Sequence, residues 1–350
     1  MTESDSKYRV AIVMPVLNEE RFLGRTLDQV YMQDFPMEQV EVVIVDGGST
    51  DRTREIAAEY RNRFGSLKIL DNPRRLSSSG RNIGVRNTDA PYIMILDGHS
   101  YLPSKAIIRS MVELFESTDA DCLCRPQPLD PPDIGDLQRV VACCRASALG
   151  HNPSSDIYSD FEGTVDPTSS GAMYRREVFK EIGFFDEDFD ACEDVDFNFR
   201  VHMARLKAII SPRLKIHYYP RGTLTGLWRQ MVRYGKGRFK FAHKHHQLAP
   251  MQMLAAIGIV GLALLLLLSL VSQAAWNWLT TLVGVYVLIV VGYSAWLAHD
   301  RGRLGCLLIG PLVFPTIHFG LGWGFLRGFI DRLHAQRQPS RNRKADIDLD

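Results

Sequence analysis

The sequence carries almost no net charge. Lys and Arg number 41 and Asp and Glu 40, which gives a formal net charge of +1 over 350 residues. The chain therefore lacks the basic surplus of a nucleic-acid-binding protein, and we expect no nucleic acid partner. With 46% apolar residues it has enough hydrophobic material for the core of one or two domains.

Cysteines are few and lack the spacing of a metal or redox motif. None of the six forms a Cys-x-x-Cys pair. We expect free thiols in a reducing compartment. Zinc at the two close doublets is a weaker alternative, because no turn chemistry supports it. These doublets are Cys122/Cys124 and Cys143/Cys144.

The start of the chain has no basic segment followed by an apolar core, which is the pattern of a secretory signal. We therefore expect residues 1–245 to stay in the cytosol.

Charge is missing from two long stretches, residues 247–297 and 304–326. Within the first stretch, Met251–Val271 and Trp276–Leu297 are each long enough to cross a hydrocarbon layer, which needs about 20 residues. Two transmembrane helices are predicted there, since helices satisfy their own backbone groups in lipid. The second stretch contains two prolines and several glycines. Both a further span and a kinked, re-entrant segment are open for it.

Basic residues flank these stretches unevenly. The turn at 273–277 is uncharged, whereas residues 299–303 and the tail after residue 327 are basic. Positive charge favours the cytoplasmic side, so we expect a multi-pass inner-membrane protein with a cytoplasmic N-terminal domain and tail. A cytoplasmic tail favours the re-entrant alternative. The basic residues before the first span are Arg233, Lys236, Arg238, Lys240 and Lys244.

The first 130 residues alternate between strand and helix periodicity. This alternation predicts an α/β domain with a mostly parallel sheet, in which ligands bind beyond the carboxyl ends of the strands. The predicted strands are 8–14, 40–45, 67–70 and 92–96. The predicted helices are 19–33, 53–64 and 79–87.

Polar residues follow the first two of these strands. Asn18 is expected to cap the next helix, with Glu19 in its first turn. The second strand ends on Asp46 and a double glycine, after which Ser49 or Thr50 is expected to start a helix. Each loop by itself is equally consistent with simple helix capping.

The fourth strand ends on Asp97 and His99. A lone pair of this kind is more often a solvated turn. However, three acidic strand ends on one sheet edge repel one another unless a cation or a ligand rich in hydrogen-bond donors uses them. The pattern therefore indicates a binding site at this edge.

Seven segments of the chain occur in the order found in glycosyltransferase family 2, whose members are inverting enzymes with the GT-A fold. The likeness covers roughly residues 8–245. It is greatest to the succinoglycan-biosynthesis (ExoA-like) branch, in which Asp-x-His replaces Asp-x-Asp at the fourth strand end. The segments are MPVLNEE, VDGGSTDRTREI, DNPRRLSSSGRNIGVRN, LDGH, GAMYRREVF, GFFDEDFDACEDVDFNFR and RQMVRYGKGR.

This resemblance implies that a UDP-sugar lies over the strand ends. Asp46 would accept the N3 hydrogen of uracil, and Pro15 and Glu19 would border the base and ribose. Asp97 would face the ribose and a divalent cation, Mn²⁺ or Mg²⁺. His99 would replace the carboxylate that binds the metal, and imidazole suits Mn²⁺ better than Mg²⁺.

The segment DACEDVDFNFR carries the chemistry that the resemblance implies. Asp194 would act as the base that takes the proton of the acceptor hydroxyl, beside Glu193. Read alone, the two carboxylates would merely favour a helix N-terminus. Asp196 is interpreted as structural. Gly171 and Ala172 resemble a loop that lets donor and acceptor sugars approach closely.

A later segment resembles the Gln-x-x-Arg-Trp helix of related synthases, with Tyr234 in place of tryptophan. Arg233 would contact the donor diphosphate, and Gln230 or Tyr234 the acceptor. The alternative is an amphipathic interfacial helix, and both readings are compatible. In that alternative three aromatic residues lie in the membrane boundary: Trp228, Phe239 and Phe241.

The expected organisation is a GT-A domain (1–222), an interfacial helix region (223–246), a membrane domain (247–327) and a basic tail (328–350). The resemblance implies transfer of a hexose, glucose in β linkage, from a UDP-sugar to a polyprenyl-diphosphate-linked saccharide. Such an enzyme would serve exopolysaccharide or envelope-glycan synthesis within an assembly complex. Two alternatives are a polyprenyl-phosphate sugar synthase, which the Gln-x-x-Arg helix disfavours, and a non-catalytic nucleotide-sugar-binding subunit. The carboxylates that such a subunit would lose are present.

Overall fold

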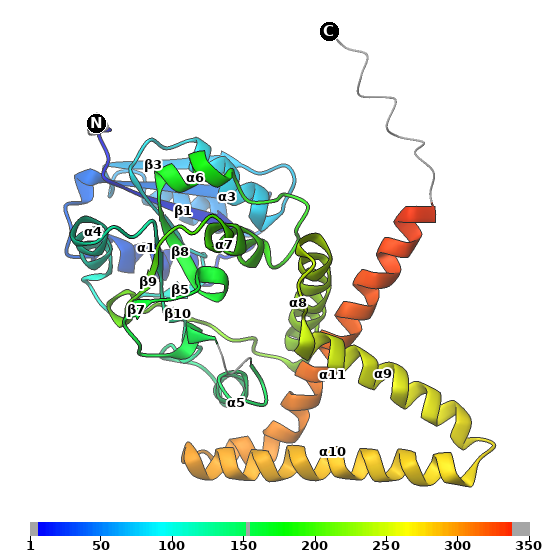
Figure 1. Ribbon diagram of the computed structural model, residues 1–350. Coiled ribbons are helices and arrows are strands. Elements are labelled where there is room, and N and C mark those ends of the chain that lie inside the picture. The colour runs from blue at the N-terminus through cyan, green and yellow to red at the C-terminus, as the bar shows by residue number, and fades with distance from the viewer. Residues whose placement is uncertain (1–5, 152–154, 338–350) are drawn as a thin grey trace. The chain divides into compact units, whose positions relative to one another are not determined.

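The computed structural model describes residues 6–151 and 155–337, which form two compact units (Figure 1). The first unit comprises the described residues up to Thr223 together with Ser294–Gly310. The second comprises Leu224–Tyr293 and the described residues from Pro311 onwards.

The first unit is built on an eight-stranded sheet with the order β3-β2-β1-β4-β8-β6-β9-β7. Its first four strands are parallel, as predicted: β1 (Val10–Val16), β2 (Val40–Asp46), β3 (Ser66–Asp71) and β4 (Tyr92–Ile95). Antiparallel β8 (Gly171–Arg175) separates β4 from β6 (Cys122–Cys124). The sheet ends with β9 (Ala208–Ile210) and β7 (Gly163–Thr164). A second, small sheet pairs β5 (Ser100–Tyr101) with β10 (His217–Tyr218).

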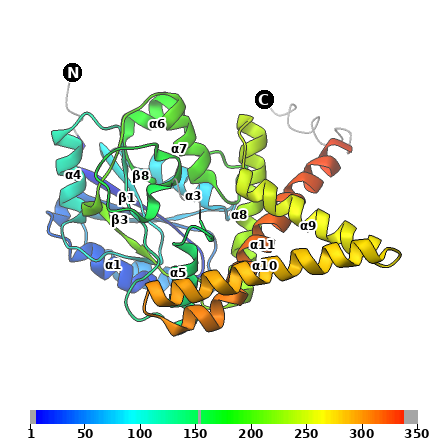
Figure 2. The same ribbon diagram turned by 60° about the horizontal axis from the view of Figure 1, so that its bottom comes forward.

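Neighbouring residues of a strand point to opposite sides of the sheet, so the apolar strands present apolar side chains on both faces. Helices cover both of these faces. Ile12 and Met14 pack with one set of helices, and Val13 and Ile93 pack with the other. The first set is α1 (Leu23–Tyr31), α2 (Thr53–Glu59) and α4 (Ile107–Ser117). The second set is α3 (Ser77–Arg86), α6 (Arg176–Ile182) and α7 (Glu193–Met203) (Figure 2). The remaining helices of this unit are α5 (Asp136–Arg145) and the 3₁₀ turns η1 (Met37–Gln39), η2 (Asp156–Tyr158), η3 (Pro167–Ser169) and η4 (Pro212–Leu214).

The loops after β1 and β2 are hydrogen-bonded to each other. Asn18 adopts φ 56° and its side chain accepts from the Thr50 amide at 2.9 Å, while its own amide donates to Ser49 Oγ at 2.9 Å. The predictions that Asn18 caps the first helix and that Ser49 or Thr50 begins the second are therefore wrong. Both helices begin later, at Leu23 and Thr53, because the polar residues join the two loops instead.

Four long helices make up most of the second unit: α8 (Leu224–His245), α9 (Pro250–Ser269), α10 (Gln273–Asp300) and α11 (Leu304–Arg337). By length and composition, α9, α10 and α11 can each cross a membrane. Side chains such as Leu268 and Leu288 are exposed, as expected for residues that face lipid. α11 stays helical through both of its prolines. It therefore has no turn at which a re-entrant hairpin would reverse.

Glycines bring α8 and α11 into close contact. Gly320, Gly324 and Gly328 are spaced four apart, and a Cβ at Gly324 would lie 2.1 Å from the Val232 carbonyl oxygen. Such small residues let two helix backbones approach each other. Phe239 of α8 packs edge-on against Phe325 and Phe329 of α11.

Candidate active site

The site lies at the edge of the sheet where β1, β2, β4 and β6 end and antiparallel β8 begins. Asp46 is the last residue of β2, and Asp97 follows β4 closely. The start of α7 joins this edge, since the Arg81 guanidinium lies 3.2 Å from Glu193 and 4.0 Å from Asp97. The topology thus gathers acidic residues that are far apart in the sequence.

Asp46 is buried and held as a hydrogen-bond acceptor. Its carboxylate accepts from Ser49 Oγ at 2.6 Å and from the Ser49 amide at 3.1 Å. Arg54 Nη1 lies 3.3 Å from the other carboxylate oxygen and also pairs with Asp71. These contacts fix the orientation of the carboxylate at the end of β2.

Asp97 and His99 follow the end of β4, and the His99 imidazole is hydrogen-bonded to Glu19. His99 Nδ1 lies 2.7 Å from Glu19 Oε1. Burial by itself lowers the pKa of His99, but the hydrogen bond to Glu19 and the charges of Glu19 and Asp97 outweigh burial, so the pKa is raised. Glu19 therefore contacts His99 in the protein, a contact that the family resemblance did not imply.

Arg81 of α3 is a buried cation that is not among the predicted site residues. Its guanidinium lies 3.2 Å from Glu193 and 4.0 Å from Asp97, and 5.3 Å from the centre of the Phe185 ring. Burial lowers the pKa of Arg81, but the charges of Glu193, Asp97 and Asp194 outweigh it, so the net shift is upward. Burial raises the pKa of Glu193, an effect that Arg81 opposes.

One signal in the sequence could have revealed Arg81. The buried face of α3 is mainly polar rather than apolar, and it includes Ser78, Ser79 and Asn82 beside Arg81. A helix that turns polar side chains inward must have partners for them.

Asp194 is the reachable carboxylate of the α7 start. Glu193 and Asp196 are both buried, whereas Asp194 is half-buried. Asp196 lies 3.2 Å from Arg200 one turn later, in agreement with a structural role. Cys192, with φ 64°, turns the chain sharply into the helix. Of the three carboxylates, Asp194 is the most accessible to solvent.

Gly171 and Ala172 belong to β8 and are buried. The prediction that they form a loop between the two sugars is wrong. Gly171 lacks a side chain because α7 packs directly against the start of β8, where a Cβ would meet Asn198.

The three residues predicted on the Gln-x-x-Arg helix lie on α8 of the second unit. Gln230 Nε2 donates to Tyr234 Oη at 3.2 Å, so these two residues share one helix face. Arg233 is exposed.

Asp97 and His99 together offer a carboxylate oxygen and an imidazole nitrogen. In residues 6–151 and 155–337, no three His, Cys, Asp or Glu side chains come together as a metal site. A divalent ion would therefore draw its other ligands from diphosphate oxygens and water, an arrangement common at phosphate-transfer sites. The mixed oxygen and nitrogen donors fit Mn²⁺. Cys122 and Cys124 lie on β6 and the other doublet on α5, all as free thiols.

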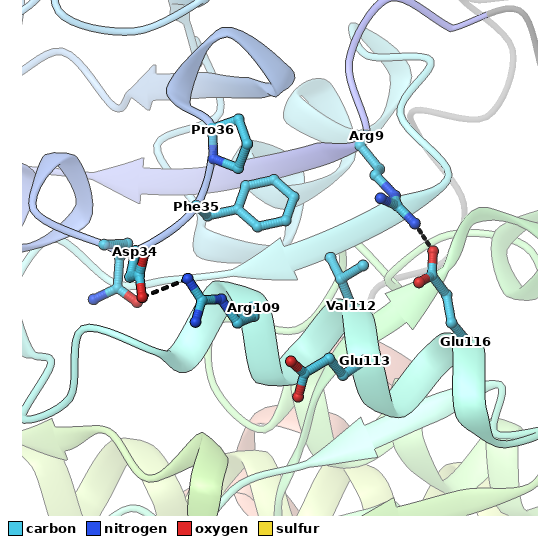
Figure 3. A pocket seen from close by; sticks show the side chains of 9 residues that line it. Arg9, Asp34, Phe35, Pro36, Arg109, Val112, Glu113 and Glu116 are labelled. Atoms are coloured by element: carbon cyan, nitrogen blue, oxygen red, sulfur yellow. Dashed lines mark ion pairs between the residues drawn. The ribbon is translucent and has the colours of Figure 1, made fainter.

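A hollow of about 550 Å³ lies elsewhere on the first unit, between the start of β1 and α4 (Figure 3). Two ion pairs line it, Arg9 with Glu116 and Arg109 with Asp34. Because Arg9 immediately precedes β1, the hollow lies at the amino ends of the parallel strands. In α/β sheets ligands bind at the opposite ends, so this hollow is not the candidate active site.

Comparison with known proteins decides the family. The family model for glycosyl transferase family 2 matches residues 11–183. Over 324 residues the chain is 30% identical to succinoglycan biosynthesis protein ExoA of Rhizobium meliloti, and this aligned region covers 91% of this chain and 94% of the relative. The chain belongs to glycosyltransferase family 2. It is a glycosyltransferase, as predicted.

A second relative and two solved structures are also similar to this chain. A dolichyl N-acetyl-alpha-D-glucosaminyl phosphate glucuronosyltransferase of Methanococcus voltae is 24% identical over 92% of this chain and 97% of its own. The mannosyltransferase PcManGT of Pyrobaculum calidifontis, in complex with GDP-Man and Mn²⁺, is 20% identical, with a TM-score of 0.55 over 87% of this chain and 88% of that one. TarS 1–349 of S. aureus with UDP-GlcNAc is 15% identical, with a TM-score of 0.52 over 95% and 93%. These structures confirm the predicted fold.

Proposed function

We propose that the protein is an inverting hexosyltransferase that uses a UDP-sugar. It adds the hexose, glucose in β linkage, to a polyprenyl-diphosphate-linked saccharide for exopolysaccharide or envelope-glycan synthesis. The observation that supports this proposal best is the set of three carboxylates at one sheet edge, Asp46, Asp97 and Asp194, with Arg81 beside the latter two.

Each carboxylate has an environment suited to a different task. Asp46, buried and oriented by Ser49, is suited to accept the uracil N3 hydrogen, with Pro15 bordering the base. Asp97 and His99 would hold a divalent ion. Such an ion supplies positive charge to the diphosphate as the sugar departs.

Asp194 is the base in this proposal. An inverting transfer needs an ionised group that can reach the acceptor hydroxyl on the face of the sugar opposite the nucleotide. Asp194 is half-exposed, whereas its neighbour Glu193 is buried against Arg81. Asp194 is therefore the carboxylate of this pair that is free to take a proton from a substrate.

In this proposal α8 binds the acceptor and lies at the membrane surface. Arg233 contacts the donor diphosphate, and Gln230 or Tyr234 the acceptor saccharide. α9 and α10 cross the inner membrane, α11 lies along α8 at the cytoplasmic side without crossing, and the sheet-containing unit faces the cytoplasm. Lys236 of the basic helix α8 lies 2.7 Å from Asp331 near the end of α11, which supports a cytoplasmic tail, since basic residues favour that side.

The names of two relatives support this proposal, one for envelope-glycan synthesis and the other for a saccharide acceptor on a lipid. One relative is a succinoglycan biosynthesis protein, and the other is named for transfer to a dolichyl-phosphate-linked sugar. We therefore place this enzyme at a lipid-linked intermediate of envelope-glycan assembly.

The test is release of UDP from a panel of UDP-sugars by purified protein in lipid, with Mn²⁺, Mg²⁺ or chelator and with a polyprenyl-linked acceptor. Asp194→Asn should lower transfer by about 10²–10⁴-fold, the usual contribution of a general base. Asp188→Asn, a change to an exposed carboxylate in the preceding loop, is the control and should leave transfer unchanged. Full activity in Asp194→Asn would refute the assignment of the base. Binding of UDP-sugars without turnover on any acceptor would refute catalysis.

A further inference from the structure

We propose that Glu19 is a positioning residue for His99: it fixes the imidazole tautomer so that Nε2 presents its lone pair to a divalent cation. The inference rests on the proposed function, since the cation is the one expected beside the diphosphate. It gives Glu19 a role different from contact with the nucleotide.

The two side chains come from loops that are 80 residues apart in sequence. Glu19 Oε1 lies 2.7 Å from His99 Nδ1, a distance typical of a charge-assisted hydrogen bond. The Glu19 side chain is only 16% exposed. It is thus directed at the imidazole rather than into solvent.

Neighbouring residues hold Glu19 in this position. Its backbone amide donates to Thr53 Oγ1 at 2.7 Å, and the Thr53 hydroxyl in turn donates to Asp51 at 2.5 Å. Gly98 leaves the necessary room, because a Cβ there would lie 3.1 Å from Glu19 Cγ and 3.1 Å from Val16 Cγ1. The Glu19 side chain therefore passes directly over Gly98 to reach His99.

An ionised carboxylate can only accept hydrogen bonds, so Nδ1 must carry the hydrogen. In the neutral ring, Nε2 then carries the lone pair that binds a metal. Among the residues that the structure describes, only Nδ1 of the ring has a hydrogen-bond partner. The Tyr218 ring lies edge-on to the imidazole, with centroids 6.1 Å apart, and limits its rotation. A carboxylate behind a metal-binding histidine acts in this way in many metal sites.

The experiment measures Mn²⁺ affinity of the full-length protein in lipid nanodiscs, with UDP present, by calorimetry. Glu19→Ala should weaken Mn²⁺ binding by about 10–100-fold, as expected when the residue that orients a metal-binding histidine is lost. Glu20→Ala is the matched control, because it removes the adjacent carboxylate, which accepts from the Arg52 amide instead. It should leave Mn²⁺ affinity unchanged.

Two further readouts separate positioning from contact with the nucleotide. UDP affinity measured with chelator should be the same in wild type and Glu19→Ala; a loss there would show that Glu19 binds the nucleotide and would overturn the inference. Pulsed EPR of bound Mn²⁺ should show coupling to an imidazole nitrogen in wild type, and the coupling should vanish in His99→Ala. Wild-type Mn²⁺ affinity in Glu19→Ala would also overturn the inference.

Gly98→Ala provides a second variant should Glu19→Ala fail to fold. The added methyl group would lie 3.1 Å from Glu19 Cγ, so the Glu19 side chain must shift by a few tenths of an ångström while it keeps its carboxylate, and Mn²⁺ affinity should fall in the same direction but by less. Unchanged affinity in a folded Gly98→Ala protein would count against the inference. Different results would refute the inference and the proposed function. Sugar transfer with Mn²⁺ affinity independent of Glu19 refutes only the inference, and Glu19-dependent Mn²⁺ binding without transfer refutes only the function.

Discussion

The ion pair between Arg81 and Glu193 allows a quantitative prediction about stability. The side chains of Arg81 and Glu193 are only 11% and 7% exposed, and their charged atoms are 3.2 Å apart. Arg81→Met removes the cation and leaves a buried carboxylate without its partner. Such a change costs about 3–5 kcal/mol of unfolding free energy. Asp97, 4.0 Å from the same guanidinium, also loses a favourable charge, which adds to the loss.

A double-mutant cycle separates the pair from other effects of the substitution. Glu193→Gln keeps a polar side chain and leaves Arg81 near Asp97, so it should cost less than Arg81→Met. Combined with Glu193→Gln, Arg81→Met should cost less than it does alone, with a coupling energy of about 1–3 kcal/mol. Arg86→Met is the control, because Arg86 lies on the same helix but its pair with Glu187 is 3.8 Å long and half exposed. Its loss should be below about 1 kcal/mol.

The loss should also depend on pH. Without Arg81, burial and the charge of Asp194 still raise the pKa of Glu193 above its value in the unfolded chain. The folded variant then binds a proton that the unfolded chain releases, so its stability falls as pH rises through that window. The deficit of Arg81→Met should be smaller near pH 5 than near pH 8, because the protonated carboxyl group of Glu193 does not need the cation.

Pulse proteolysis in urea on detergent-solubilised protein measures the folded fraction of each variant. Two results would refute the reasoning: Arg81→Met as stable as Arg86→Met, or a deficit that is the same at both pH values.

Three other changes test the packing and the topology. In the second unit, Gly235→Ala places a Cβ 2.1 Å from the Leu321 carbonyl oxygen and should lower the free energy of unfolding by about 1–3 kcal/mol. Gly258→Ala is the control, because nothing lies within 4 Å of the added Cβ, and it should leave stability unchanged. Equal thermal unfolding of the two variants would contradict the contact between α8 and α11. Arg125 is buried, donates to Tyr218 Oη at 2.6 Å and has two guanidinium nitrogens without a partner in the described chain, so Arg125→Met should leave stability in pulse proteolysis unchanged or higher; a clear drop would contradict this. Reporters fused after Arg303 and after Asp350 should both be cytoplasmic, and opposite locations would contradict the argument from Lys236 and Asp331.

Local patterns were sufficient to predict the parallel part of the sheet and the membrane helices. The apolar runs at 40–45 and 92–96 form β2 and β4, and the predicted spans Met251–Val271 and Trp276–Leu297 form most of α9 and α10. A short apolar run between helical segments is buried most favourably in a sheet, and a long run without charge is buried most favourably in lipid. Asp46 and Asp97 were therefore placed correctly at the carboxyl ends of their strands.

The errors fall where a distant segment sets the local structure. The sequence predicts a loop at Gly171 and Ala172, but pairing with β4 and β6 makes 171–175 a strand. Asn18 has the composition of a helix cap, but its hydrogen bonds go to Ser49 and Thr50 of the next loop. In both cases the partners lie outside the window in which periodicity and capping signals operate.

The sequence by itself determined the class of fold, the strand ends that bear carboxylates and the segments suited to lipid, because each depends on hydrophobic periodicity within a few turns of chain. Only the tertiary structure decided which carboxylates are paired. Arg81 reaches Glu193 across more than a hundred positions of sequence, and Glu19 reaches His99 over a glycine in another loop. The charge and orientation of a buried side chain depend on its neighbours in space, and the crossing of strands and helices alone determines those neighbours.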